Sequence, residues 1–130
     1  MFKTLPAMAL VAFASLAHAD VVVIGNSAAA PLTKDQVSDV FLGKSQAFTP
    51  IDQPESAPVR ADFYKKATGR DAAQVKATWS RLVFTGKAVA PKEVADAAAV
   101  KKAVAADPKA IGYIDKSAVD GSVKVVLALD

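Results

Sequence analysis

The chain has 130 residues, with 16 lysines and arginines against 13 aspartates and glutamates, a formal net charge of +3, no cysteine and one histidine. That histidine, His18, lies near the N-terminus, so residues 20–130 contain neither imidazole nor thiol. This excludes from them a cysteine nucleophile, a Ser-His-Asp triad and a zinc site of cysteine and histidine, and leaves a carboxylate mechanism or an all-oxygen metal site formally open. The basic residues are scattered, so we expect no nucleic-acid partner.

Residues 1–19 have the layout of a secretory signal peptide. Lys3 precedes an apolar run over Leu5–Leu16, and Ala17-His18-Ala19 is a small-x-small cleavage site. The run is shorter than the roughly 20 residues that span a bilayer, which disfavours the alternative of an uncleaved anchor. We therefore expect cleavage after Ala19, which leaves residues 20–130 as one periplasmic or secreted domain that is not embedded in the membrane.

Strand-like and helix-like patterns alternate along residues 20–130, which predicts an α/β domain. Thr33-Lys34-Asp35-Gln36 and Asp71-Ala72-Ala73-Gln74 are capping boxes that mark two helix starts. Two large apolar residues of the third helix, Trp79 and Phe84, are expected in the core, with a ligand platform as the alternative. The expected strands are 21–24, 47–51, 110–114 and 123–129, and the expected helices are 33–43, 56–69, 71–86 and 91–107.

The start of the second helix is the clearest chemical feature. Ser56 is expected to cap it, with Pro58 in the first turn, because proline there sacrifices no needed N–H and a serine hydroxyl accepts from a free one. Helix starts bind small oxyanions through spare N–H groups and the helix dipole, and Arg60 would add a fixed charge. Nearby carboxylates are expected to be solvated or to face the dipole rather than to catalyse a reaction: Asp52, Glu55 and Asp62.

A second candidate contact follows the first strand. Gly25-Asn26-Ser27 comes at its carboxyl end, and open α/β sheets bind ligands just beyond such ends. Ser27 is therefore a candidate ligand contact, and an ordinary polar turn is the alternative. No residue pattern predicts a catalytic group, a metal site or a cofactor.

Several short motifs, taken in order, resemble the substrate-binding proteins of phosphate ABC transporters. Val40-Phe41-Leu42-Gly43-Lys44 resembles that family's FLGK signature, and Ala110-Ile111-Gly112-Tyr113-Ile114 resembles its AIGYV strand. Phe84-Thr85-Gly86 lies between them in the same order. The resemblance covers most of residues 20–130. It implies a type II periplasmic-binding-protein-like α/β fold, reduced to a single domain with a small mixed sheet flanked by helices.

The resemblance also implies a function. It suggests non-catalytic binding of inorganic phosphate or a similar oxyanion, without a cofactor, for delivery to an ABC transporter permease. The family's Gly-Ser-Gly-Thr phosphate loop matches Glu55-Ser56-Ala57-Pro58, of which Ser56 alone keeps a hydroxyl. Glu55 and Pro58 in that loop favour the alternative, an exported interaction or accessory protein that kept the fold and lost the ligand. The expected ligand-binding residues are Ser56, Arg60, Ser27 and Ala57.

Overall fold

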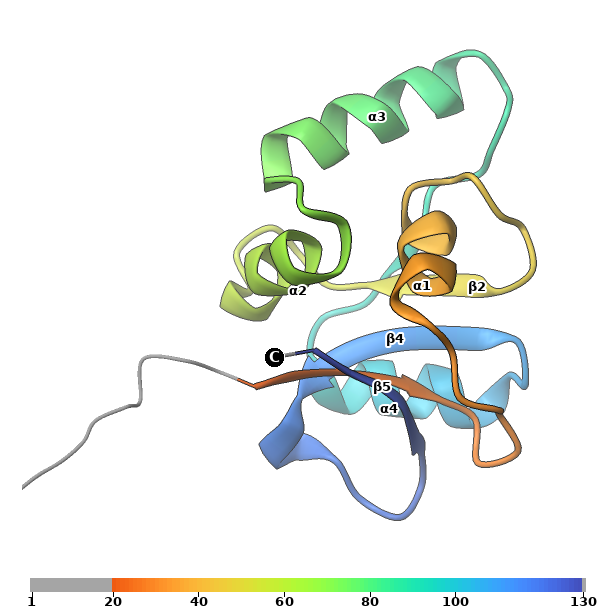
Figure 1. The fold of residues 1–130 in the computed structure, drawn as a ribbon, viewed down its shortest axis with the longest axis vertical. Coiled ribbons are helices and arrows are strands. Elements are labelled where there is room, and N and C mark those ends of the chain that lie inside the picture. The colour runs from red at the N-terminus through yellow and green to blue at the C-terminus, as the bar shows by residue number, and fades with distance from the viewer. Residues whose placement is uncertain (1–19, 130) are drawn as a thin grey trace, which may run out of the picture.

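One five-stranded sheet, in the order β3-β2-β4-β1-β5, runs through the molecule with helices on both faces (Figure 1). The computed structural model describes residues 20–129, so the predicted signal peptide and its cleavage site lie outside the described residues. Within 20–129, no helix is both long enough and apolar enough to cross a bilayer. The strands are β1 (Val21–Gly25), β2 (Thr49–Asp52), β3 (Lys92–Glu93), β4 (Ala110–Asp115) and β5 (Lys124–Leu129). The helices are α1 (Lys34–Phe41), α2 (Pro58–Thr68), α3 (Ala72–Phe84), α4 (Ala97–Ala106) and the 3-10 helix η2 (Lys116–Ala118).

Two strand directions meet in this sheet. β2 runs parallel to β3 and β4, whereas β1 runs antiparallel to β4 and β5. Asp52, at the carboxyl end of β2, therefore lies at the same end of the sheet as the start of β1, and the turn after β1 lies at the opposite end. The predicted α/β class, a small mixed sheet flanked by helices, is confirmed.

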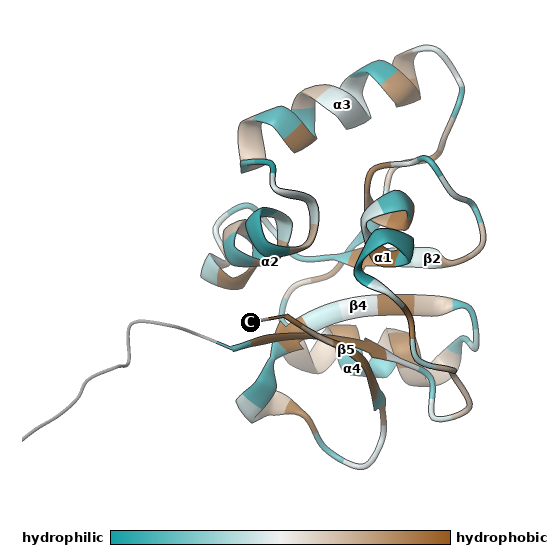
Figure 2. Cartoon of the chain, in the orientation of Figure 1, coloured by the Kyte–Doolittle hydropathy of each residue, from teal (hydrophilic) through white to brown (hydrophobic). Residues whose placement is uncertain are grey.

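Alternate residues of the central strand β1 point into two separate cores. Val21 and Val23 pack with α1, α2 and α3, while Val22 and Ile24 pack with α4 on the other face. This alternation explains why the predicted first strand is apolar throughout, since a strand covered on both faces has no polar side. Figure 2 shows the hydrophobic colour along β1 and β5 and the hydrophilic colour on much of α1.

Local sequence signals place most helix ends correctly. Both predicted capping boxes form: the Thr33 hydroxyl accepts from Gln36 N–H at 3.1 Å, and the Asp71 carboxylate accepts from Gln74 N–H at 2.9 Å. Gly112 of β4 lies close to α4, because a β-carbon there would lie 2.5 Å from Cγ1 of Val100. The missing side chain lets α4 pack tightly against β4.

The helix predicted from Pro91 is wrong at its start. Residues 92–93 instead form β3, which pairs with the end of β2, and α4 begins only at Ala97. Asp96 is its N-cap and accepts from a backbone N–H at 2.9 Å. Proline permits a first helical turn without enforcing one, and here the pairing with β2 decides the conformation. As a result, Glu93 lies beside the carboxyl end of β2.

Two aromatic residues of the third helix were expected in the domain core, but only Trp79 is buried, whereas Phe84 is 91% exposed. The reason is the angle between the two side chains around the helix axis. Five residues at about 100° each turn Phe84 roughly 140° away from the direction of Trp79, so both cannot face the sheet. Phe84 is also the last residue of α3, where the helix passes beyond the body of the domain (Figure 1).

Candidate functional site

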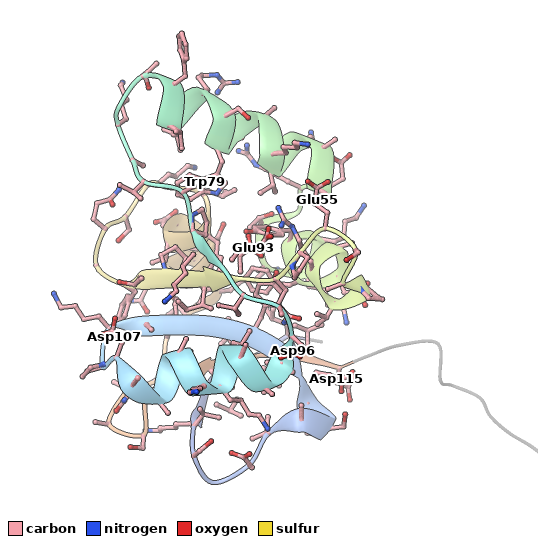
Figure 3. All side chains as sticks on the ribbon, turned by 180° about the vertical axis from the view of Figure 1, so that it is seen from behind. Glu55, Trp79, Glu93, Asp96, Asp107 and Asp115 are labelled. Atoms are coloured by element: carbon pink, nitrogen blue, oxygen red, sulfur yellow. The ribbon has the colours of Figure 1, made fainter. Side chains whose placement is uncertain are left out.

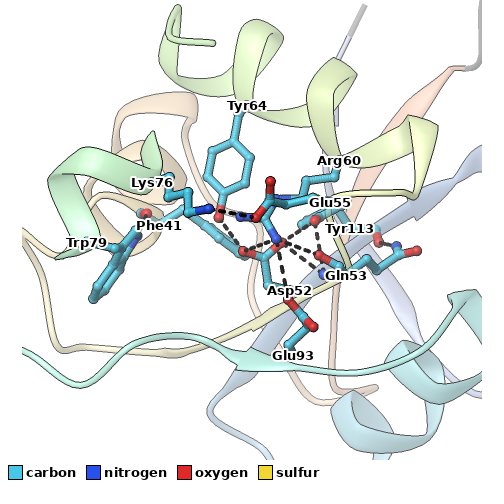
Figure 4. Close-up of polar contacts among 10 residues, drawn as sticks. All are labelled: Phe41, Asp52, Gln53, Glu55, Arg60, Tyr64, Lys76, Trp79, Glu93 and Tyr113. Carbon is cyan, nitrogen blue, oxygen red and sulfur yellow. Dashed lines mark hydrogen bonds and ion pairs between the residues drawn. The ribbon is translucent and has the colours of Figure 1, made fainter. Parts of the chain in front are cut away.

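A buried carboxylate, Asp52, lies at the carboxyl end of β2 and is only 5% exposed. Its Oδ2 accepts from the Tyr64 hydroxyl at 2.6 Å, and its Oδ1 accepts from the Gln53 N–H at 2.9 Å and from the Tyr113 hydroxyl (Figure 4). Three donors to one carboxylate offset much of the free energy that burying its charge costs. The expectation that Asp52 is solvated is therefore wrong.

The fold explains why these side chains meet. β2 and β4 are parallel neighbours, and their register brings Tyr113 of β4 beside Asp52 of β2. On α2, Arg60 and Tyr64 are four residues apart and so share one face of the helix. That face points at the end of β2, and it places a cation and a hydroxyl donor on the same carboxylate.

Arg60 is the cation of this cluster, and its side chain is only 11% exposed. Its Nη1 donates to the Gln53 carbonyl oxygen at 2.8 Å and lies 3.9 Å from Asp52 Oδ2 and 3.5 Å from Glu93 Oε1. Its Cζ lies 5.7 Å from the centre of the Tyr64 ring, a cation–π distance. Its Nε is buried and has no hydrogen-bond partner among residues 20–129. Arg60 is thus a fixed positive charge with one donor unused.

Both tyrosines are held as proton donors. Burial, and after it the negative charge of Asp52 and the hydrogen bond to it, raise the pKa of Tyr64 well above the ordinary tyrosine value. The same causes in the same order raise the pKa of Tyr113. Neither hydroxyl ionises near neutral pH, so their role is to stabilise the charge of Asp52 rather than to exchange protons.

A pocket of about 490 Å³ opens beside this cluster, between α3 and the segment that leads into β3. Its charged wall has two cations and two carboxylates: Arg60, Lys76, Asp52 and Glu93. Lys76 is exposed, and its Nζ lies 3.5 Å from Glu55 Oε2. Figure 3 shows Glu93, Glu55 and Trp79 in the region between α3 and the sheet. The rest of the lining is mostly apolar: Trp79, Val83, Phe84, Ala90 and Pro91.

The predicted helix-start site differs from the structure. The N-cap is Ala57, without a side-chain cap bond, and Ser56 lies one residue too early, in an exposed turn. The reason is Pro58: it begins the helix and forces the residue before it into an extended conformation, so the cap falls on Ala57. The Ala57 N–H donates to the Pro54 carbonyl oxygen at 2.9 Å, so it is not a spare donor for an anion. Arg60 points back toward the end of β2 rather than toward this turn.

Ser27 is far from the other predicted site residues. It follows β1, whose carboxyl end lies at the opposite end of the sheet from Asp52. Its neighbour Asn26 donates from Nδ2 to the carbonyl oxygens of Val104 and Ala105, at 3.3 and 3.0 Å, and so caps the end of α4. The turn therefore has a structural role through Asn26. Of the four predicted residues, the structure places Arg60 alone in the pocket.

Sequence reasoning missed most of the cluster. Asp52 and Glu93 are 41 residues apart in the chain and meet only because β3 pairs with β2. The available signal was the spacing of Arg60 and Tyr64, four residues apart on a helix that directly follows a strand ending in an acid. In the part of the chain that the structure describes, no three acidic, histidine or cysteine side chains are grouped as metal ligands.

No family model and no curated protein match this chain. Its fold does match solved structures. An ABC-type phosphate transport receptor from Vibrio cholerae aligns with a TM-score of 0.64 at 20% identity. A candidate phosphate ABC transporter substrate-binding protein from Clostridium perfringens, solved with bound phosphate, aligns with a TM-score of 0.66 at 21% identity. Each alignment covers 83% of this chain but only 45% and 44% of those chains, so this chain spans less than half of their length. At this identity the likeness establishes the fold alone, which this chain shares with part of each of those two structures.

Proposed function

We propose that this protein is an exported, non-catalytic binding protein for a small oxyanion, with phosphate as the first candidate. The observation that carries the proposal is Arg60. It is a largely buried cation in the wall of a pocket. A guanidinium donates strong, charge-assisted hydrogen bonds to oxyanions. The fold shared with proteins named for phosphate transport supports the same proposal.

The surroundings of Arg60 favour an anion over a cation. Asp52 already accepts three hydrogen bonds, so little of its acceptor capacity is left for a cationic ligand. Glu93, by contrast, is 58% exposed and can move away from Arg60 when an anion enters. Lys76 at the exposed rim would supply a second positive charge. Two or three charge-assisted hydrogen bonds at about 1.5–3 kcal/mol each sum to about 3–9 kcal/mol, which corresponds to a dissociation constant between about 6 mM and about 0.3 µM.

Calorimetric titration of the purified protein with phosphate tests this proposal, and Trp79 gives an independent signal. It is the single tryptophan of the sequence, and it lines the pocket. We expect saturable heat and a change in fluorescence with phosphate. Arg60→Gln should abolish both, and Lys76→Gln should weaken binding severalfold.

The matched control is Arg81→Gln, which removes the same charge from an exposed site on α3 outside the pocket. It should leave binding unchanged. Circular dichroism and thermal unfolding show whether each variant is folded. Lys76 is exposed, so Lys76→Gln should keep the fold even if Arg60→Gln does not. Absence of binding by the unmodified protein at millimolar phosphate and sulfate contradicts the proposal.

Export and delivery belong to the same proposal. The predicted signal peptide supports export, and mass spectrometry of the protein from the periplasmic fraction should give a mature chain that begins at Asp20. The resemblance to transporter substrate-binding proteins supports delivery to an ABC transporter permease. If so, the purified protein should bind the detergent-solubilised permease, and phosphate should strengthen that binding.

One observation favours a second candidate, an interaction or accessory protein without a ligand. Phe84 and Val89 are 91% and 87% exposed, and exposed apolar side chains mark interaction surfaces where they gather into a patch. This candidate predicts no anion binding, together with a defined partner whose association is lost in Phe84→Ser. The phosphate titration therefore separates the two candidates.

A further inference from the structure

The pocket is larger than inorganic phosphate needs. Five heavy atoms, at the roughly 30 Å³ that a water molecule occupies, would fill only about a third of its 490 Å³. Pockets of about 300–1,000 Å³ usually hold organic molecules. Resting on the oxyanion site proposed above, we infer that the preferred ligand is an organic phosphate monoester, with an apolar group about as large as a phenyl ring.

The apolar part of the lining supports this inference. Trp79 is held in place, because its indole N–H donates to the Phe41 carbonyl oxygen at 2.8 Å. One turn further along α3, Val83 lines the same pocket and remains 48% exposed. A small inorganic anion at Arg60 would leave Val83 in water. An apolar group on the ligand would cover it, which is the usual advantage of an exposed apolar wall.

Three of the four charged lining residues come from other elements than the apolar residues, and the fourth, Lys76, lies on α3 at the exposed rim. Asp52, Arg60 and Glu93 come from β2, α2 and β3, at the end of the sheet. The apolar residues come from α3 and the segment before β3. Figure 4 shows Trp79 to one side of the group around Arg60 and Asp52. This separation suits a ligand that is anionic at one end and apolar at the other.

The test compares three probes by calorimetry: inorganic phosphate, phenyl phosphate and phenol. Phenyl phosphate should bind at least about tenfold more tightly than inorganic phosphate, since covering about 60 Å² of apolar surface has roughly that effect. Val83→Ser should weaken binding of phenyl phosphate severalfold and leave binding of inorganic phosphate unchanged. Val125→Ser, at a half-exposed position on β5 outside the pocket, is the control and should change neither.

The outcomes separate this inference from the function on which it rests. If both phosphates bind with equal affinity, the inference is overturned and oxyanion binding stands. If neither binds, the proposed function fails and the inference fails with it. If phenol binds as tightly as phenyl phosphate, the pocket recognises the ring without the anion, and both proposals are wrong.

Discussion

Glu93 is the group that an incoming anion must displace, and its removal tests the proposed site directly. Its Oε1 lies 3.5 Å from Arg60 Nη1, and its side chain is 58% exposed. Glu93→Gln removes the negative charge and keeps the length and shape of the side chain. The variant should therefore bind phosphate more tightly than the unmodified protein.

The expected gain in phosphate affinity follows from two electrostatic contributions. In water, unit charges 3.5 Å apart attract by about 1.2 kcal/mol, and exposed ion pairs are measured at about 0.2–1 kcal/mol. Breaking the Arg60–Glu93 pair on binding therefore costs at most about 1 kcal/mol. An anion on Arg60 about 5 Å from Glu93 would add a repulsion of about 0.8 kcal/mol. Removing both terms strengthens binding by about 1–2 kcal/mol, a factor of roughly five to thirty.

The assay is calorimetric titration with phosphate at low salt and again at about 0.15 M salt, where screening should reduce the gain. Asp35→Asn is the control, because it removes the same charge from an exposed position in the first turn of α1, outside the pocket. It should change the affinity less than twofold. Unchanged binding in Glu93→Gln would refute the reasoning, and weaker binding would mean that Glu93 accepts a hydrogen bond from the ligand rather than competing with it.

Three further predictions concern stability. Tyr64→Phe removes a 2.6 Å hydrogen bond to the buried Asp52 carboxylate, and urea unfolding should show a loss of about 1.5–3 kcal/mol. The raised pKa of Tyr64 means that the folded state keeps a proton that the unfolded chain releases near pH 10. The contribution of Tyr64 to stability is therefore full below pH 10 and is lost as the pH rises above it. Above pH 10, the free energy of unfolding should fall about 1.4 kcal/mol per pH unit less steeply in Tyr64→Phe than in the unmodified protein. Gly112→Ala should cost about 1–3 kcal/mol in the same assay, because its β-carbon meets a side chain of α4 at 2.5 Å, whereas Gly121→Ala, with open space around it, should change little.

The parts of the fold that were predictable are those set by neighbouring residues. The box at Thr33 and that at Asp71 each satisfy backbone N–H groups within one turn, so sequence alone locates both helix starts. Four consecutive β-branched residues after Asp20 indicate a strand buried on both faces, and β1 is such a strand. In each case the free energy that decides the structure comes from residues within a few positions of one another.

The errors arise where distant segments decide. The residues after Pro91 pair with β2 rather than beginning a helix, and no local sequence pattern predicts that pairing. Ser56 has suitable chemistry for a cap, but Pro58 moves the helix start by one residue. Phe84 is apolar and belongs to an amphipathic helix, yet it lies past the turn that reaches the core. Propensity and spacing are weak guides at such positions because tertiary contacts override them.

The candidate site was only partly predictable for the same reason. Arg60 was identified as a fixed charge, but its partners were not, since they come from β2, β3 and β4 and converge only in the folded sheet. A helix-start site would have been local and hence visible in the sequence. A pocket beside the end of a sheet depends on strand order, which the sequence pattern leaves open.

This arrangement also explains how a chain spanning less than half of its structural neighbours could still hold an anion. Asp52 partly compensates the charge of Arg60, and the Tyr64 and Tyr113 hydroxyls in turn compensate the charge of Asp52. The guanidinium is therefore held in one position by groups within this domain. Binding to a preorganised cation avoids much of the entropy of ordering the site on association. The charge is thus positioned entirely by residues of this domain, and the proposed ligand would place its apolar group along the apolar side of the same pocket.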